Sequence, residues 1–234
     1  MNPFRTLWQQ RGYLPWIFHT LYFNFHYLPW RQAVRLPIWV RRIKMVATRG
    51  RIIIDAATVR PGMIQLGRHM VSIYPDTGII WDQHGGEVVF HGECNIGSGA
   101  AVSFGRNTHV EFGHHFVASA QWRCVSYRGI EFGENTRFGW NNLVMDTNLH
   151  RLYDRDKKAF KKASGRIVIG AHNWFATDCR VLHSTVTPPR CIFAAGTTVT
   201  PRTPMESYCV SGGSPARILT RNVERIYGQD SDGE

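Results

Sequence analysis

The chain has 234 residues, of which 43% are hydrophobic, enough for one globular domain with a short appendage. Its formal net charge is +11, and residues 1–60 hold ten Lys or Arg against one acid, Asp55. A basic surface favours anionic partners, but without zinc-finger spacing or an RNA-binding signature we expect no nucleic-acid partner. Five cysteines, an odd number without a C-x-x-C pair, predict reduced thiols in a cytoplasmic protein.

Residues 1–50 are expected to form an aromatic, basic helical segment. Within them Pro15 suits a helix start and Pro29 a helix end. The apolar residues at helical spacing are Leu14, Ile17, Phe18, Leu21, Tyr22 and Phe25. The stretch is too short to span a membrane, and no signal-peptide cleavage site follows it. Two compatible roles stay open: a cap on the end of the domain, or contact of residues 14–45 with the inner face of an anionic membrane.

From residue 51 the sequence changes to short apolar units separated by glycine and other small residues, which predict β-strands. The clearest rhythm places Ile169, Phe175, Val181, Thr187, Phe193 and Val199 at every sixth position. A period of six fits neither a helix nor an ordinary strand. It fits a coil with three flat sides and roughly 18 residues a turn, in which the apolar residues point inward and small residues form the corners.

We therefore predict an all-β domain over residues 51–220, a left-handed parallel β-helix of hexapeptide repeats. Upstream of residue 150 the rhythm has slips, and Phe stands at many inward positions, which predicts a wider or less regular cross-section there. Residues 215–227 are predicted to form a short C-terminal helix, and residues 221–234 are assigned to a C-terminal tail that ends in a polar stretch.

The rhythm breaks at one place. Phe138, Val144 and His150 fall at successive inward positions, and residues 151–166 then carry seven Lys or Arg against two Asp. A charged excursion from a solenoid is expected to be a surface loop, and such loops often carry function.

Three ordered segments, residues 169–176, 193–200 and 212–217, resemble the end pattern of the hexapeptide-repeat acyltransferases. Residues 21–29 and the sequence D-T-N-L-H at 146–150 are similar to a subgroup associated with surface polysaccharide synthesis. The resemblance implies an O-acyltransferase that moves an acyl group, expected to be acetyl, from acyl-CoA to a sugar hydroxyl of a polysaccharide or glycan precursor.

The resemblance also implies that His150 is the catalytic base. Acyl transfer requires removal of the hydroxyl proton, and an imidazole with a pKa of about 6.5 is a free base at neutral pH. Asp146 and Asn148 are the candidates to orient it. Asn148 stands where the subgroup pattern, D-[ST]-D-x-H, has a second Asp.

Matched positions imply where the substrates bind. The expected donor is acetyl-CoA, and no metal is expected. The residues assigned to the cofactor are Thr177, Ala195, Thr200 and Arg217. Trp174 and Trp140 are assigned to the acceptor. The family is trimeric and holds CoA in a groove between two subunits, which implies a homotrimer.

Two other functions stay open at this point. The first is a zinc hydratase of the γ-carbonic anhydrase type, because such sites bind zinc through histidines. The candidate ligands are His109 and His114, with His84, His91 and His115. The second is a non-catalytic β-helix scaffold at a membrane.

Overall fold

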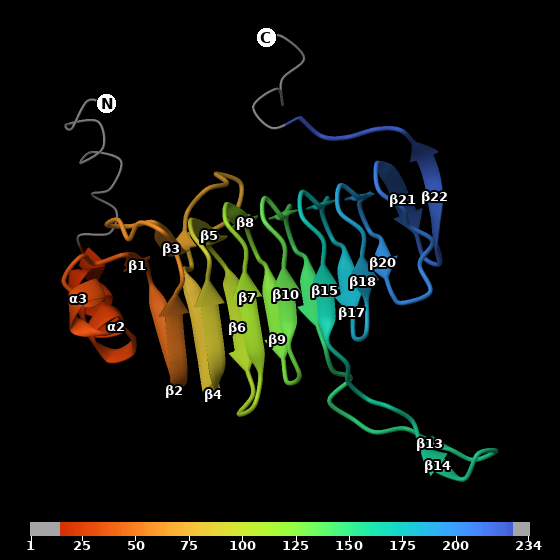
Figure 1. Ribbon diagram of the computed structural model, residues 1–234, viewed down its shortest axis with the longest axis horizontal. Helices are drawn as coiled ribbons and strands as arrows, with labels where there is room; N and C mark the ends of the chain where they lie inside the picture. The colour runs from red at the N-terminus through yellow and green to blue at the C-terminus, as the bar shows by residue number, and fades with distance from the viewer. Residues whose placement is uncertain (1–14, 227–234) are drawn as a thin grey trace.

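The computed structural model describes residues 15–226, which form a parallel β-helix with two short helices at its N-terminal end (Figure 1). The helices are α2 (Ile17–Tyr27) and α3 (Trp30–Ala33). A nine-stranded sheet contains β1 (Ile38–Val40), β3 (Ile64–Arg68), β5 (Cys94–Gly97), β8 (Phe116–Ala118), β11 (Arg137–Phe138), β16 (Trp174–Phe175), β19 (Ile192–Phe193), β21 (Cys209–Gly213) and β22 (Ala216–Arg221). The predicted parallel β-helix is therefore confirmed.

An 11-stranded sheet forms the rest of the coil. It contains β2 (Ile43–Ile54), β4 (Ile79–Phe90), β6 (Ala100–Phe104), β7 (His109–Phe112), β9 (Arg123–Ser126), β10 (Ile130–Phe132), β12 (Leu143–Met145), β15 (Ile167–Ile169), β17 (Arg180–Leu182), β18 (Val186–Thr187) and β20 (Thr198–Val199). Strands β13 (Tyr153–Asp154) and β14 (Ala159–Phe160) pair with each other as a separate hairpin.

The 11-stranded sheet covers two sides of the coil because strand β4 bends. Its first half pairs with β6 and its second half with β7. Gly86 lies at the bend with a φ of +66°, and a Cβ there would come within 2.3 Å of the Thr108 carbonyl oxygen, so glycine is required.

We call the nine-stranded sheet side 1, the strands stacked on β6 side 2, and those stacked on β7 side 3. The first corner joins sides 1 and 2, and the second corner joins sides 2 and 3.

The predicted 18-residue turn is confirmed at the C-terminal end of the coil, where Trp174 pairs with Ile192 and Ile192 pairs with Val210. Turns nearer the N-terminus are longer, since Cys94 pairs with Phe116, 22 residues further on. The extra residues widen the corners, and this is where the sequence predicts a wider cross-section.

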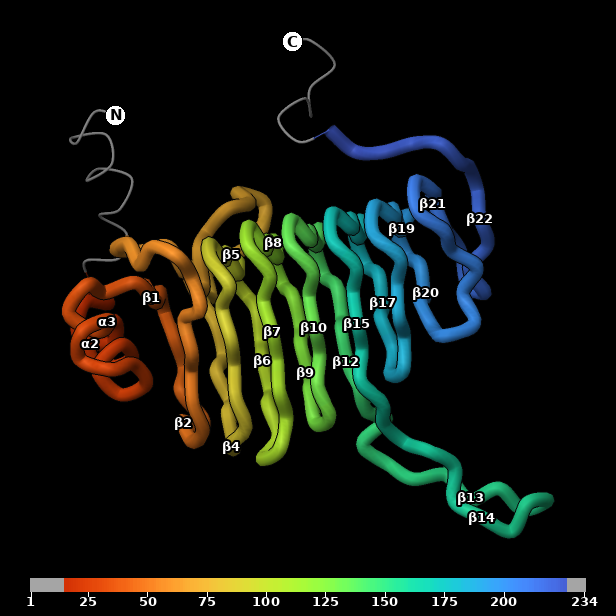
Figure 2. The backbone as a smooth tube through the Cα atoms, in the orientation of Figure 1, coloured from red at the N-terminus to blue at the C-terminus, as the bar shows by residue number. Residues whose placement is uncertain are grey.

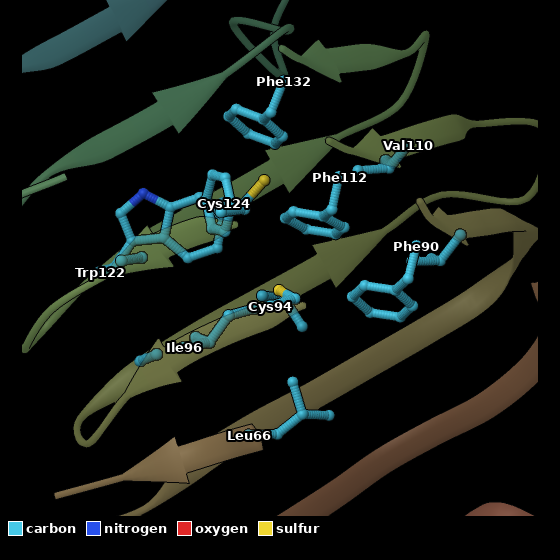
Figure 3. Close-up of a cluster of buried hydrophobic side chains, with 14 of the residues drawn as sticks. Leu66, Phe90, Cys94, Ile96, Val110, Phe112, Trp122, Cys124 and Phe132 are labelled. Carbon is cyan, nitrogen blue, oxygen red and sulfur yellow. The ribbon is translucent and has the colours of Figure 1, made fainter. Parts of the chain in front are cut away.

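Aromatic side chains fill the wider part of the core. Figure 3 shows Phe90, Phe112 and Phe132 in one column, with ring centroids 5.1 and 5.2 Å apart. Trp122 lies beside this column, edge-on to Phe132 at 5.8 Å. Offset and edge-on ring contacts of this kind stabilise a core beyond simple burial, and they explain why Phe replaces the smaller aliphatic residues at these positions.

The predicted N-terminal helix is confirmed as α2, and it caps the first coil. Its buried Asn24 bridges to β1, because Nδ2 donates to the Ile38 carbonyl at 2.6 Å and Oδ1 accepts from the Ile38 N–H at 3.1 Å. Tyr27 accepts a hydrogen bond from the buried Trp81 indole at 3.1 Å. The β-helix begins earlier than the predicted residue 51, however, since β1 and β2 already start at residues 38 and 43.

The predicted C-terminal helix is wrong. The segment forms strand β22, which pairs antiparallel with β21. The last coil ends in an open strand edge whose backbone groups need partners, and a returning strand supplies them where a helix would not. The part of the tail beyond residue 226 lies outside the described residues.

All five cysteines are buried and free, as the sequence predicts. Burial raises the pKa of the Cys179 thiol to about 11 and that of Cys191 to about 12. We expect native protein at pH 8 to resist thiol alkylation, because the thiolate is the reactive form. Since these values lie above the ordinary 9.0 of an unfolded thiol, the free energy of unfolding should fall as pH rises above about 9. Mass spectrometry after alkylation, with and without urea, checks the prediction that the native thiols resist alkylation. Rapid labelling of the native protein would contradict it.

Candidate active site

The charged excursion of the sequence leaves the coil at the second corner. It starts after β12, carries the β13–β14 hairpin away from the body of the coil, and returns into β15 (Figures 1 and 2). Backbone hydrogen bonds close its base: Asn148 N–H donates to the Ala163 carbonyl at 2.7 Å, and Gly165 N–H to the Asp146 carbonyl at 2.9 Å. The two strands of the excursion therefore leave and return side by side, which holds residues 146–150 in a defined position.

Asp146 is completely buried beneath this loop. Its carboxylate accepts four hydrogen bonds: from Ser126 Oγ at 2.9 Å and from the backbone N–H groups of Tyr127, Arg128 and Gly129 at 2.8, 2.8 and 2.7 Å. These donors form the second corner one coil below. Asp146 therefore holds two coil corners together, and its oxygens do not serve to orient the His150 ring as the sequence analysis predicts.

The side chain of His150 is exposed and makes no side-chain hydrogen bond with the residues that the structure describes. Its imidazole is thus available to a substrate, although it does not take the inward position that the hexad rhythm assigns to it. The other predicted partner, Asn148, contacts a different histidine: its Nδ2 lies 3.2 Å from His183 Nε2. The predicted Asn148–His150 pair is therefore not formed.

His183 is a site residue that the sequence analysis missed. It follows β17, whose Leu182 pairs with Met145, so His183 lies one coil above Asp146. Its Nδ1 is 3.2 Å from Ser184 Oγ, and with Asn148 on the other nitrogen both ring nitrogens have neighbours. Hexad counting does not reveal this stacking, because the 37 residues between Asp146 and His183 leave 21 without the 151–166 excursion, and 21 is not a multiple of six.

The predicted cofactor residues lie at two different places. Thr177 and Ala195 lie in successive turns of the first corner, and Thr177 Oγ1 donates to the Trp140 carbonyl at 3.1 Å. Trp140, Thr177 and Ala195 therefore form one column, which we call the first-corner column. Thr200, by contrast, follows β20 and lies above Leu182 at the end of side 2, toward the second corner.

The remaining two predicted positions lie elsewhere. Arg217 is exposed on β22. Trp174 is half-buried on β16, where the Arg225 guanidinium lies over its ring at 4.3 Å. Within one chain, then, the donor and acceptor residues predicted from the sequence do not surround a single pocket.

A cleft of about 810 Å³ opens at the base of the excursion. Its charged lining residues are Arg128, Arg151, Lys161, Lys162 and Arg166. Two of these cations are neutralised, Arg166 by Glu131 at 2.7 Å and Lys161 by Asp154 at 3.6 Å. A second hollow of about 490 Å³, lined by His84, Arg106 and Arg128 among others, continues along the same corner. Arg128 lines both, so the second corner carries two adjoining basic hollows, which we call the basic groove.

Four of the five histidines considered as zinc ligands lie against carboxylates, and the fifth, His114, accepts a hydrogen bond at Nδ1 from the Glu93 backbone N–H at 3.2 Å. His109 is 3.2 Å from Glu87 and 2.9 Å from Glu111, and His91 is 3.0 Å from Glu111. His84 contacts Asp82 and His115 contacts Glu93. Among residues 15–226, no group of three or more His, Cys, Asp or Glu side chains is arranged to hold a metal ion. The geometry of one chain therefore lends no support to the zinc-hydratase hypothesis.

The chain has the fold of the hexapeptide-repeat acetyltransferases. The crystal structure of the polySia-specific acetyltransferase NeuO superposes with a TM-score of 0.60 at 15% identity, over 81% of this chain and 74% of that chain. A maltose O-acetyltransferase from Clostridium difficile 630 is 20% identical over 56% of this chain and 67% of that chain, with a TM-score of 0.45. At these identities the likeness establishes the fold alone.

Sequence comparison adds little to this structural likeness. No family model matches the chain. A curated protein, the serine protease EspC of Escherichia coli O127:H6, is 30% identical over 69 residues, which are 29% of this chain and 5% of that protein. The chain thus spans only a small fraction of the curated relative that it matches. Of the helices in residues 15–226, none is long and apolar enough to cross a membrane.

Proposed function

We propose that this protein is an acyl-CoA-dependent O-acetyltransferase that modifies a sugar hydroxyl of a surface polysaccharide or its precursor. One observation supports this above all: on a β-helix of the hexapeptide-repeat kind, His150 presents an exposed imidazole at the base of a loop, next in sequence to Arg151, which lines the basic cleft. The free, buried cysteines agree with a cytoplasmic location.

In the proposed reaction His150 acts as the general base. The acceptor hydroxyl oxygen attacks the thioester carbonyl carbon of acetyl-CoA while its proton passes to the imidazole. The tetrahedral intermediate collapses, the carbon–sulfur bond breaks, and the imidazolium returns the proton to the CoA thiolate. No covalent acyl-enzyme is needed, and no metal takes part in these steps.

We further propose that the complete site lies between two subunits of a homotrimer. The first-corner column and the His150 loop occupy different corners of one coil, and no cleft described in one chain is lined by both. A neighbouring copy that places its first corner against the second corner would bring them together. Acetyl-CoA would then lie along Thr177 and Ala195 of one subunit, with its thioester near His150 of the other.

The proposed activity has a direct test. Purified protein incubated with acetyl-CoA and a panel of acidic and neutral oligosaccharides should release CoA thiol only when an acceptor is present. Mass spectrometry should find one or more acetyl groups on that acceptor. A panel that yields neither acceptor-dependent thiol nor acetylated sugar, with folded protein, would contradict the proposal.

The basic groove favours an anionic acceptor. Arg128, Arg151 and Lys162 line the cleft beside the His150 loop, and the described residues place no carboxylate against their charged groups. Arginine and lysine bind carboxylate and phosphate groups through charge-assisted hydrogen bonds. We therefore propose that the acceptor carries acidic groups near the hydroxyl that is acetylated.

Replacing Lys162 or Arg128 by alanine is expected to raise KM for an acidic acceptor about tenfold, the effect of one charge-assisted hydrogen bond, and to weaken its salt dependence. KM for acetyl-CoA should change less than about twofold. Lys157→Ala is the matched control, because Lys157 lies in the same excursion but outside the cleft. A rise in KM for acetyl-CoA in place of the acceptor would assign the cleft to the CoA phosphates.

A further inference from the structure

The N-terminal cap exposes a set of large apolar side chains on its outer surface. Phe18 is 79% exposed and Trp30 is 70% exposed. The other members of this surface, all more than a third exposed, are Ile17, Tyr22, Phe25 and Val34. We call these six residues the aromatic cap face. Single exposed apolar residues are ordinary on a protein, but a contiguous group of this size marks an interaction surface.

The contact between the cap and the coil is made mainly by other side chains. Helix α2 packs against the first coil through its other face, which buries Thr20, Phe23, Asn24 and Tyr27. Phe25 and Trp30 pack on each other, with ring centroids 5.3 Å apart, but both stay exposed. The more apolar face of the helix therefore points outward and the more polar face points inward. A helix that only caps a core has the opposite arrangement, with its apolar face inward.

The charge around the cap indicates what this face contacts. Residues 15–54 contain seven Lys or Arg and neither Asp nor Glu. Arg31 and Arg35 are exposed next in sequence to Trp30 and Val34 of the aromatic cap face. Two copies docked through it would bring like charges together with no acid between them, which disfavours self-association. An anionic lipid surface would bind both the aromatic and the basic residues of the cap, because aromatic rings lie at the level of the headgroups and basic side chains pair with acidic lipids.

The position of the cap fits this partner. The two helices lie at one end of the coil, and β22 lies at the other (Figure 2). Helix α2 has 11 residues and would lie in the plane of the interface. The hairpin of the excursion extends from the body of the coil well away from the cap (Figure 1), so contact at the cap leaves the His150 loop open.

We propose that the aromatic cap face docks the protein on the surface of an anionic lipid bilayer. The inference is independent of the transferase activity, because it rests on residues far from the His150 loop.

Sedimentation of the full chain with lipid vesicles tests the proposal. Wild-type protein should bind vesicles that contain phosphatidylglycerol and bind pure phosphatidylcholine at least tenfold more weakly. The double variant Phe18→Ser, Trp30→Ser should lose at least tenfold in binding to the anionic vesicles. The charge variant Arg31→Glu, Arg35→Glu should lose binding while keeping the apolar surface. Ile73→Ser is the control, because Ile73 is 71% exposed but lies outside the cap.

Several outcomes would overturn the proposal. One is wild-type protein that stays in the supernatant with anionic vesicles; another is a double variant, folded by circular dichroism, that binds as well as the wild type. If light scattering showed instead that the double variant lowers the oligomeric state, the face would be an interface between copies of the chain. Loss of vesicle binding by the Ile73→Ser control would show that the effect is not specific to the cap.

Discussion

Replacing His150 by alanine should lower kcat for acetyl transfer about a thousandfold, within the range expected when a general base is removed. His150 is exposed and makes no side-chain hydrogen bond with the described residues, so the fold should not change. The measurement is acceptor-dependent release of CoA thiol, followed at saturating acetyl-CoA, together with the melting temperature of each variant.

His183→Ala is the informative comparison. His183 lies beside Asn148 and Ser184, so its loss should loosen the loop and lower kcat by less than about tenfold. If His183→Ala abolished transfer while His150→Ala kept more than a tenth of the activity, the roles assigned to the two histidines would have to be exchanged. Full activity in both variants would show that neither histidine is the general base, whereas a folded wild-type protein without transfer activity would favour the scaffold hypothesis.

Replacing Asp146 by alanine is expected to destabilise the protein by about 3 kcal/mol or more, because the buried donors of the corner below would lose their acceptor. That corresponds to a drop in Tm of about 10 °C for a chain of this size. Denaturant unfolding monitored by circular dichroism provides the measurement. The folded fraction should keep far more activity than His150→Ala, because Asp146 contacts the corner at residues 127–129 and acts on His150 only through the backbone.

Asp154→Ala is the matched control for this prediction. Asp154 also accepts backbone hydrogen bonds, from the N–H groups of Asp156 and Lys157 at 3.1 and 3.0 Å, and the Lys157 bond is the largest cause of its lowered pKa. Asp154 is only half-buried, however, and lies in the hairpin that extends from the coil, so water can replace the lost acceptor. The Tm should hardly change. Equal destabilisation by the two substitutions would contradict the idea that burial makes Asp146 important.

The coil itself could be predicted from the sequence because its period is local. Each hexapeptide repeats the same inward position, so Phe175, Val181 and Phe193 indicate a core without knowledge of any long-range contact. The greater width of the upstream turns could also be predicted from the sequence, because the slips in the hexad rhythm and the inward Phe residues occur in the same region.

The roles within the site could not be read from a local pattern. Asp146 acts on residues 127–129, and His183 lies over Asp146 only because the excursion is excluded from the coil. Such contacts depend on the register between neighbouring turns, which the irregular lengths of the upstream coils obscure. The sequence therefore assigned Asp146 and Asn148 to His150, which neither side chain contacts.

The two ends of the coil illustrate the same limit. Strand β2 is mostly exposed or half-buried, so it lacks the inward apolar rhythm of the later repeats. The predicted start of the β-helix, residue 51, was therefore too late in the chain. At the other end, strand β22 exists because β21 offers an unpaired edge, and that requirement is a property of the folded coil rather than of residues 216–221.

The central claim is that one acetyl-CoA is shared by two subunits, with its thioester at His150. A crystal structure of the protein with CoA tests it most directly. The predicted result is a trimer in which the pantetheine arm lies along Thr177 and Ala195 of one subunit and the thiol lies within hydrogen-bonding distance of the imidazole of a neighbouring subunit. CoA bound wholly within one chain, or with its thiol remote from every His150, would contradict the account.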